Sequence, residues 1–168
     1  MDELANQEDV RRIASALPGA REVEGRFAFS VENKGKEKSF VWVWMERLEP
    51  KKRRQPRADV IAVRVRNQGE KAALLGADPD AFFTEPHYNG FPAVLVRLRA
   101  VSTPLLRRLI VEAWRCQAPP ELVKDGAVSQ RIRRRPRNSS RGPQSGAPPI
   151  SVQKKARRRH PSDGRRRP

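Results

Sequence analysis

The sequence predicts one domain of mixed helices and strands (α+β), residues 1–125, followed by a disordered basic tail, residues 126–168. Two observations predict the domain: helix-like spacing of apolar residues near both of its ends, and strand-like segments between them. The third observation is the tail's composition, which is rich in Arg, Pro, Ser and Gly and nearly free of aliphatic residues. Such a segment buries too little apolar surface to offset the entropy lost on ordering.

The formal net charge of +17 is distributed unevenly along the 168 residues. Residues 1–126 carry 22 Lys and Arg against 18 Asp and Glu, whereas residues 127–168 carry 14 against the single acid Asp163. Most of the basic character therefore belongs to the tail. A lone cysteine, Cys116, excludes an internal disulfide. No apolar run reaches the ~20 residues of a membrane helix, and the acidic start is no secretory signal. We expect a cytoplasmic protein without a membrane partner.

The first helix is expected over residues 8–17, where apolar residues recur at i, i+3, i+4 and i+7. Pro18-Gly19 ends it. Strands are expected over residues 20–47, with a hairpin turn in the polar segment Asn33–Lys36. The strand Ser39–Met45 is apolar throughout, and simple alternation predicts one face made of Phe40, Trp42 and Trp44. We expect core packing for these tryptophans, with an exposed stacking platform for bases as the alternative.

A basic loop, Glu49–Arg57, is expected between two strands. One interpretation is a solvated loop, and the other is a wing whose cations contact phosphates. The cations are Lys51, Lys52, Arg53, Arg54 and Arg57. Arg64, Arg97 and Arg99 are further candidates on the adjoining strands.

The later elements are a strand over residues 59–65, a helix over residues 68–75, and the aromatic stretch Phe82–Leu98. In that stretch Asn89-Gly90 predicts a tight turn, because both residues tolerate positive φ. Residues 93–98 read as a buried strand. The last helix is expected to begin at Ser102-Thr103-Pro104, with a hydroxyl as N-cap and proline in the first turn, and to end before Pro119.

Three segments carry a resemblance to a known family: RIASALPGAREV, EPHYNGFPAVLVRL and LLRRLIVEAWRCQAPPELV. In this order they resemble the MmcQ/YjbR-like family of small bacterial proteins, over roughly residues 8–124. The resemblance implies a two-layer fold, frataxin-like or secretion-chaperone-like, in which an antiparallel sheet carries helices on one face. It also implies DNA binding through a "double wing" of strand-connecting loops, here Asn33–Lys38 and Lys51–Arg57.

Enzyme signatures such as a phosphate loop, HExxH or GxGxxG do not occur in the sequence. A Glu85–His87 acid–base pair and a Cys116–His87 pair are conceivable, but a structural role for His87 is favoured. No metal-ligand cluster is recognisable. We therefore expect a protein that is not an enzyme and uses no cofactor or metal.

The leading hypothesis is a DNA-binding protein that tolerates any sequence, with RNA as a second nucleic-acid partner. We expect it to be a monomer and to associate with the nucleoid. Phosphate contacts would come from the basic loop and from the tail. The tail arginines in question are Arg133, Arg134, Arg135, Arg157, Arg158 and Arg159. The alternative is a small-ligand or protein-interaction module, or an enzyme of unknown chemistry, which the tail only localises. Its site would be formed by Trp42, Trp44, His87 and Tyr88.

Overall fold

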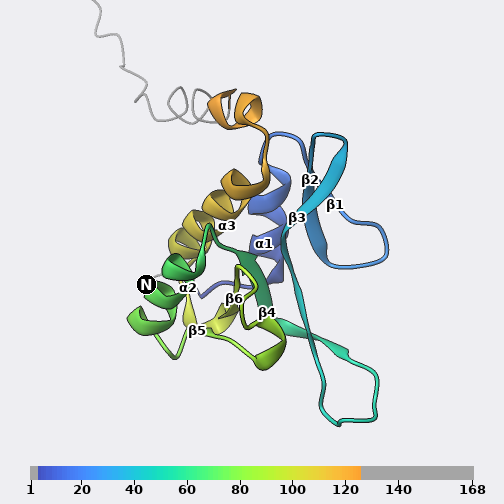
Figure 1. The fold of residues 1–168 in the computed structure, drawn as a ribbon, viewed down its shortest axis with the longest axis vertical. Coiled ribbons are helices and arrows are strands. Elements are labelled where there is room, and N and C mark those ends of the chain that lie inside the picture. Colours follow the sequence, from blue (N-terminus) through green and yellow to red (C-terminus); the bar gives the residue numbers. More distant parts are fainter. Residues whose placement is uncertain (1–3, 126–168) are drawn as a thin grey trace, which may run out of the picture. The chain divides into compact units, whose positions relative to one another are not determined.

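The computed structural model describes residues 4–125 of the chain (Figure 1). The predicted disordered tail, with the six tail arginines named above, lies outside the described residues. The described elements, in chain order, are α1 (Gln7–Ser15), β1 (Ala20–Glu22), β2 (Ala28–Asn33), β3 (Lys36–Glu46), β4 (Gln55–Arg64), α2 (Gln68–Ala77), β5 (Phe82–Phe83), the 3-10 turn η1 (Pro86–Tyr88), β6 (Ala93–Arg97), the 3-10 turn η2 (Leu98–Ala100) and α3 (Thr103–Gln117).

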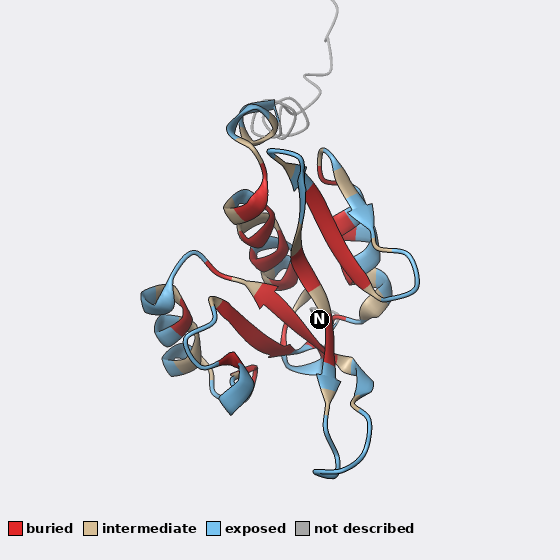
Figure 2. Cartoon of the chain, turned by 45° about the vertical axis from the view of Figure 1, so that its right-hand side comes forward, coloured by how far each residue is buried: buried red, intermediate tan, exposed pale blue. Residues whose placement is uncertain are grey.

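The six strands form one antiparallel sheet in the order β1-β2-β3-β4-β6-β5. The main core lies between one face of this sheet and the helices, with the fully buried Trp114 of α3 among its largest side chains (Figures 1 and 2). Partly buried Leu74 and Leu75 of α2 pack against the same core. The predicted α+β class, an antiparallel sheet with helices on one face, is confirmed.

Local sequence signals position the helices. Asn6 caps α1, because its side chain accepts from the backbone N–H groups of Glu8 and Asp9 while the Asp9 carboxylate accepts from the Asn6 N–H. This capping box was not predicted. Ser102 caps α3 as expected, with proline in the first turn.

The predicted hairpin turn joins β2 and β3. Lys34 and Gly35 have φ values of 54° and 70°, the left-handed pair that suits a two-residue hairpin. Strand β3 already begins at Lys36. The first wing candidate, Asn33–Lys38, is therefore a two-residue turn flanked by strands and not a loop of six residues.

The prediction that Phe40, Trp42 and Trp44 share one face of the sheet is wrong. The register between β2 and β3 shifts at Phe29/Ser30, where Phe29 pairs with Val41 and Ser30 with Ser39. Phe40 is thus the extra residue of a β-bulge, and it packs into the helix-side core together with Val41. Trp42 and Trp44 belong to a second, smaller cluster around Ala62 and Leu95.

Strand β4 begins earlier than expected, at Gln55, so Pro56 and Arg57 belong to the strand and not to the basic loop. Residues 55–57 pair only with β3, whereas β6 pairs with residues 60–64. One side of this short segment therefore needs no backbone donor, which explains why a proline is tolerated there. The β3–β4 hairpin extends away from the rest of the described domain (Figure 1), and its tip is exposed (Figure 2).

The aromatic stretch covers the second cluster with a short turn. Phe91 N–H donates to the Tyr88 carbonyl at 3.1 Å, and Asn89 has φ −63° and ψ 129°. The predicted tight turn is present, and of its two central residues only Gly90 has positive φ, 73°. The chain therefore makes a type II turn, which requires positive φ at one central residue only.

Candidate functional site

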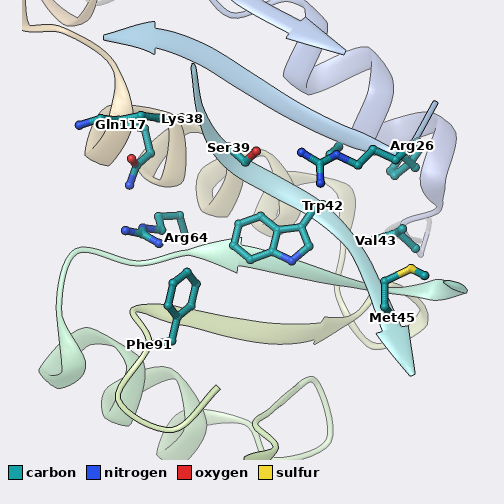
Figure 3. A pocket seen from close by; sticks show the side chains of 11 residues that line it. Arg26, Lys38, Ser39, Trp42, Val43, Met45, Arg64, Phe91 and Gln117 are labelled. Carbon is teal, nitrogen blue, oxygen red and sulfur yellow. The ribbon is translucent and has the colours of Figure 1, made fainter. Parts of the chain in front are cut away.

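A groove of about 520 Å³ opens beside the strands β2, β3 and β4 (Figure 3). Its lining combines aromatic and apolar side chains with three cations, and it includes no Asp or Glu among the described residues. The residues that line it are Arg26, Phe27, Ala28, Lys38, Ser39, Trp42, Val43, Met45, Arg64, Phe91 and Gln117.

Trp42 and Phe91 supply the aromatic surface of the groove. Trp42 is half-buried, and its indole Nε1–H donates to the Tyr88 hydroxyl at 3.1 Å. Phe91 is 40% exposed, and its ring centroid lies 6.3 Å from that of Trp42 at an interplanar angle of 72°. The two rings therefore form a corner that is held in place by the ring of Tyr88, which also contacts Phe91 edge-to-face.

Three cations line the groove beside this corner: Arg26 before β2, Lys38 on β3 and Arg64 at the end of β4 (Figure 3). The Arg64 guanidinium lies over the Phe91 ring, 4.8 Å from its centroid. Within residues 4–125, none of the three forms an ion pair. The described side chains that line the groove therefore carry a net positive charge.

A buried lysine holds the turn that carries Phe91. Lys71 of α2 is only 4% exposed, and its ammonium donates to the carbonyls of Tyr88 at 2.6 Å and Phe91 at 3.2 Å. In the part of the chain that is described, no carboxylate pairs with it. Burial lowers the pKa of Lys71 below its ordinary value.

A second hollow of about 500 Å³ adjoins the groove and shares Lys38, Arg64 and Gln117 with it. It adds two cations, Arg66 and Arg115, but both pair with Glu112 of α3, at 3.6 Å and 2.6 Å. Cys116 also lines this hollow, and burial is the main cause that raises the pKa of its thiol. The thiol is therefore a poor nucleophile at neutral pH.

The predicted basic wing is largely neutralised. Lys52 pairs with Glu49 at 2.7 Å, and Arg54 pairs with Glu85 at 3.4 Å. Arg57 pairs with both Glu46 and Asp59. Two of the five cations of the wing, Lys51 and Arg53, have no ion pair within the described range 4–125.

The four residues of the predicted ligand site are only partly brought together. Trp42 and Tyr88 are hydrogen-bonded, and exposed His87 lies edge-to-face against Tyr88, 5.8 Å between ring centroids. Trp44 is 8% exposed and packs against Phe83. Of the four, Trp42 lines the groove, whereas Tyr88 is buried and contacts Trp42 without lining the groove.

Sequence reasoning named Arg64 as a candidate and included Lys38 as the last residue of the first wing candidate, but it missed Arg26. Arg26 lies between the short strand β1 and β2, outside any run of charges. Arg97, another candidate, lies over the Phe83 ring and donates to the carbonyls of Pro79 and Asp80, which gives it a structural role. Arg99 is exposed in η2.

The comparisons with known proteins name no activity for the relatives that they find. No family model matches the chain. Over 69 residues it is 48% identical to two mycobacterial proteins, "Uncharacterized protein Rv2570" of Mycobacterium tuberculosis (strain ATCC 25618 / H37Rv) and "Uncharacterized protein Mb2600" of Mycobacterium bovis. The aligned region is 41% of this chain and 54% of each relative, so the chain spans about half the length of the curated relatives it matches.

A solved structure shares the fold. Deinococcus radiodurans protein DR2400, a DUF419 domain protein, superposes with a TM-score of 0.54 and 16% identity, and the match covers 77% of this chain and 91% of that one. DUF419 is a YjbR/MmcQ-like fold family, the one that the sequence motifs resemble. In residues 4–125, no helix is long and apolar enough to cross a membrane, and no group of three His, Cys, Asp or Glu side chains could hold a metal ion.

Proposed function

We propose that the protein binds nucleic acid without sequence preference, and that the groove contributes affinity from the domain itself. One observation carries the proposal: Arg26, Lys38 and Arg64 line the groove beside an aromatic corner, and no carboxylate lines it within the described residues. Cations that lack an internal partner remain available for phosphate oxygens, and their contacts release counterions from the nucleic acid. The role proposed is binding, not catalysis.

The basic hairpin and the tail supply supplementary contacts in this proposal. Exposed Lys51 and Arg53 at the hairpin tip retain their charge for phosphates. The tail arginines would add affinity of the same kind, since a segment rich in cations binds any polyanion. Because this affinity reflects charge alone, it decreases steeply with salt and does not discriminate between sequences.

The volume of the groove favours a second candidate, a small anionic ligand with an aromatic ring. About 520 Å³ falls within the range of small-molecule sites, which are mostly apolar with a few directed polar groups. The Trp42–Phe91 corner and the three cations fit that description. A free mononucleotide would satisfy the same side chains as a nucleotide within a strand.

The proposal is tested by nucleic-acid binding across a salt series. The full chain is compared with a full-length variant in which the six tail arginines, Arg133, Arg134, Arg135, Arg157, Arg158 and Arg159, are replaced by Ser. Each is titrated with oligonucleotides of two unrelated sequences at 50 and 200 mM salt. We expect both proteins to bind, with equal affinity for the two sequences and weaker binding at high salt.

Arg64→Gln in the tail-substituted protein then probes the groove, and Arg108→Gln on the exposed side of α3 is its control with the same change of charge. We expect Arg64→Gln to weaken binding about tenfold and Arg108→Gln to change it less than threefold, because contact energies to phosphate exceed long-range effects in salt. Equal effects of the two substitutions, or no binding by the tail-substituted protein, would overturn a role for the domain.

A further inference from the structure

We propose that the groove receives one unpaired nucleotide of a single strand, with its base against the Trp42–Phe91 corner and its phosphate at Arg64, which lies over Phe91. Arg26 and Lys38, which line other parts of the groove, would contact neighbouring phosphates of the strand. The domain would therefore prefer single-stranded over double-stranded nucleic acid. This inference rests on the proposed function and deepens it, since charge alone would attract both forms.

The aromatic corner has the properties of a stacking platform. The rings of Trp42 and Phe91 meet at 72°, so a base that stacks on one ring contacts the edge of the other. Trp42 is fixed by its hydrogen bond to Tyr88, and the backbone of Phe91 is fixed by Lys71. Neither ring has to be ordered when a base arrives, which keeps the entropic cost of binding small.

Apolar and polar parts of the groove match the two parts of a nucleotide. The exposed side chain of Met45 and the buried Val43 continue the apolar surface beyond Trp42 (Figure 3). The cations Arg26, Lys38 and Arg64 come from three different segments, with Arg26 on one side of Trp42 and Lys38 and Arg64 on the other (Figure 3). A planar base with an attached anion is complementary to this arrangement, because the ring is desolvated while the charge stays at the polar rim.

Base pairing would keep a nucleotide away from the corner. In a duplex the base faces are stacked on their neighbours, and only base edges and phosphates reach a protein surface. Unpaired bases can be splayed out and stacked on aromatic side chains, an interaction of about 1–3 kcal/mol per base that tolerates every base type. The half-buried position of Trp42 thus selects a flexible strand.

Four probes separate stacking from charge, all with the tail-substituted full-length protein. They are dT12, a 12-unit abasic deoxyribose-phosphate strand, a 12-base-pair duplex and dTMP. Tryptophan fluorescence reports on the groove, because Trp44 and Trp114 are buried whereas Trp42 is half-exposed. We expect dT12 to quench the fluorescence and to bind at least tenfold more tightly than the abasic strand and the duplex, and dTMP to bind far more weakly than dT12.

Two substitutions test the corner. Phe91→Leu removes the exposed aromatic face but keeps apolar volume, and Trp42→Phe removes the fluorophore in the groove. We expect Phe91→Leu to weaken dT12 binding five- to tenfold and to leave abasic-strand binding unchanged, and Trp42→Phe to abolish most of the quenching. Leu48→Ala at the exposed hairpin tip is the control for loss of a surface apolar group. Urea unfolding midpoints verify that each variant is folded.

The outcomes distinguish the inference from the proposed function. Equal affinity for dT12, duplex and abasic strand would overturn the inference and leave sequence-tolerant binding intact. Equal affinity for dTMP and dT12 would overturn the strand assignment and indicate a free-nucleotide site. Binding of none of the four probes by either the tail-substituted or the unmodified chain would overturn the proposed function itself.

Discussion

The Lys71 ammonium donates a 2.6 Å hydrogen bond to the carbonyl of Tyr88, seventeen residues further along the chain, from a position that is 4% exposed. A buried cation without a carboxylate partner in the described part of the chain is unusual, because desolvation disfavours its charge. Here two backbone carbonyls of the aromatic turn compensate for it. The helix α2 thereby fixes the loop that carries Phe91 into the groove.

Replacement of Lys71 by Met is expected to lower the free energy of unfolding by about 1–3 kcal/mol, because two charge-assisted hydrogen bonds to the carbonyls of Tyr88 and Phe91 are lost while the apolar stem is retained. Urea unfolding measures the change. Exposed Lys124→Met is the matched control and should stay within about 0.5 kcal/mol of the unsubstituted protein. A Lys71→Met protein as stable as the control would show that the turn holds itself in place.

The chain has one tyrosine, so phenolate absorbance reports on Tyr88 alone. Burial is the main cause that raises its pKa above the ordinary 10.0, and the hydrogen bond from Trp42 opposes the shift. Between 10.0 and the raised value the folded state binds more protons than the unfolded state. Stability from this group is therefore complete below pH 10.0 and is lost as the pH rises through the folded pKa.

We expect the phenolate titration of the folded protein to have its midpoint above 10.0, and that of the urea-unfolded protein to return to about that value. The free energy of unfolding should decline over the same pH range. A folded-state midpoint at or below the ordinary value would contradict the buried position of the phenol.

Alanine substitutions at three glycines distinguish the cost of backbone strain from the cost of steric contact. Gly19 has φ +67°, and a Cβ there would lie 2.7 Å from Cδ1 of Leu122. Gly25 has φ +77° with open space around it, and Gly76 in α2 has neither positive φ nor a close neighbour. We expect Gly25→Ala to cost about 1 kcal/mol and Gly19→Ala about 1–2 kcal/mol, whereas Gly76→Ala gains up to about 1 kcal/mol. Thermal or urea unfolding of the three variants orders them.

The ion pairs of the β3–β4 hairpin predict unequal effects of its cations on nucleic-acid binding. Arg57 is bound by Glu46 and Asp59, while Lys51 and Arg53 have no carboxylate partner within residues 4–125. Substitution of both Lys51 and Arg53 by Gln should make the slope of log K against log salt less negative, by about 0.7 per lost phosphate contact for a single strand. Arg57→Gln should leave that slope unchanged. A larger change of slope for Arg57→Gln than for the double substitution would contradict the assignment of Arg57 to a structural ion pair.

The sequence predicted those parts of the fold that depend on local chemistry. The Lys34-Gly35 turn, the Ser102 cap and the apolar face of α3 each follow from residues close together in the chain. The bulge at Phe40 could not be predicted, because every residue from Phe40 to Met45 is apolar and alternation alone gives no sign of an extra residue. Whether the bulge forms depends on the register in which β3 pairs with β2, and that register is not encoded in the local sequence of β3.

The groove was predicted only in part for a similar reason. Trp42 stood out because tryptophan is rare in the chain, and Arg64 because it lies on an evident strand. Arg26, Lys38 and Phe91 converge on them from separate segments, and only the strand order β2-β3-β4-β6 brings these together. In contrast, the conspicuous charge run at residues 51–57 proved to be partly paired with the carboxylates of Glu46, Glu49, Asp59 and Glu85, all of which lie outside it.

The two outermost strands of the sheet are short, three residues in β1 and two in β5. Their exposed backbones offer few free N–H and C=O groups for a further strand, and β1 also carries Arg21 and Glu22 in ion pairs. Edges of this kind resist fibril-like self-assembly, which is a hazard for any sheet protein that polyanions concentrate locally. If many copies of the chain bind side by side on one nucleic acid, as the proposed function implies, these short edges would keep the copies from pairing with one another.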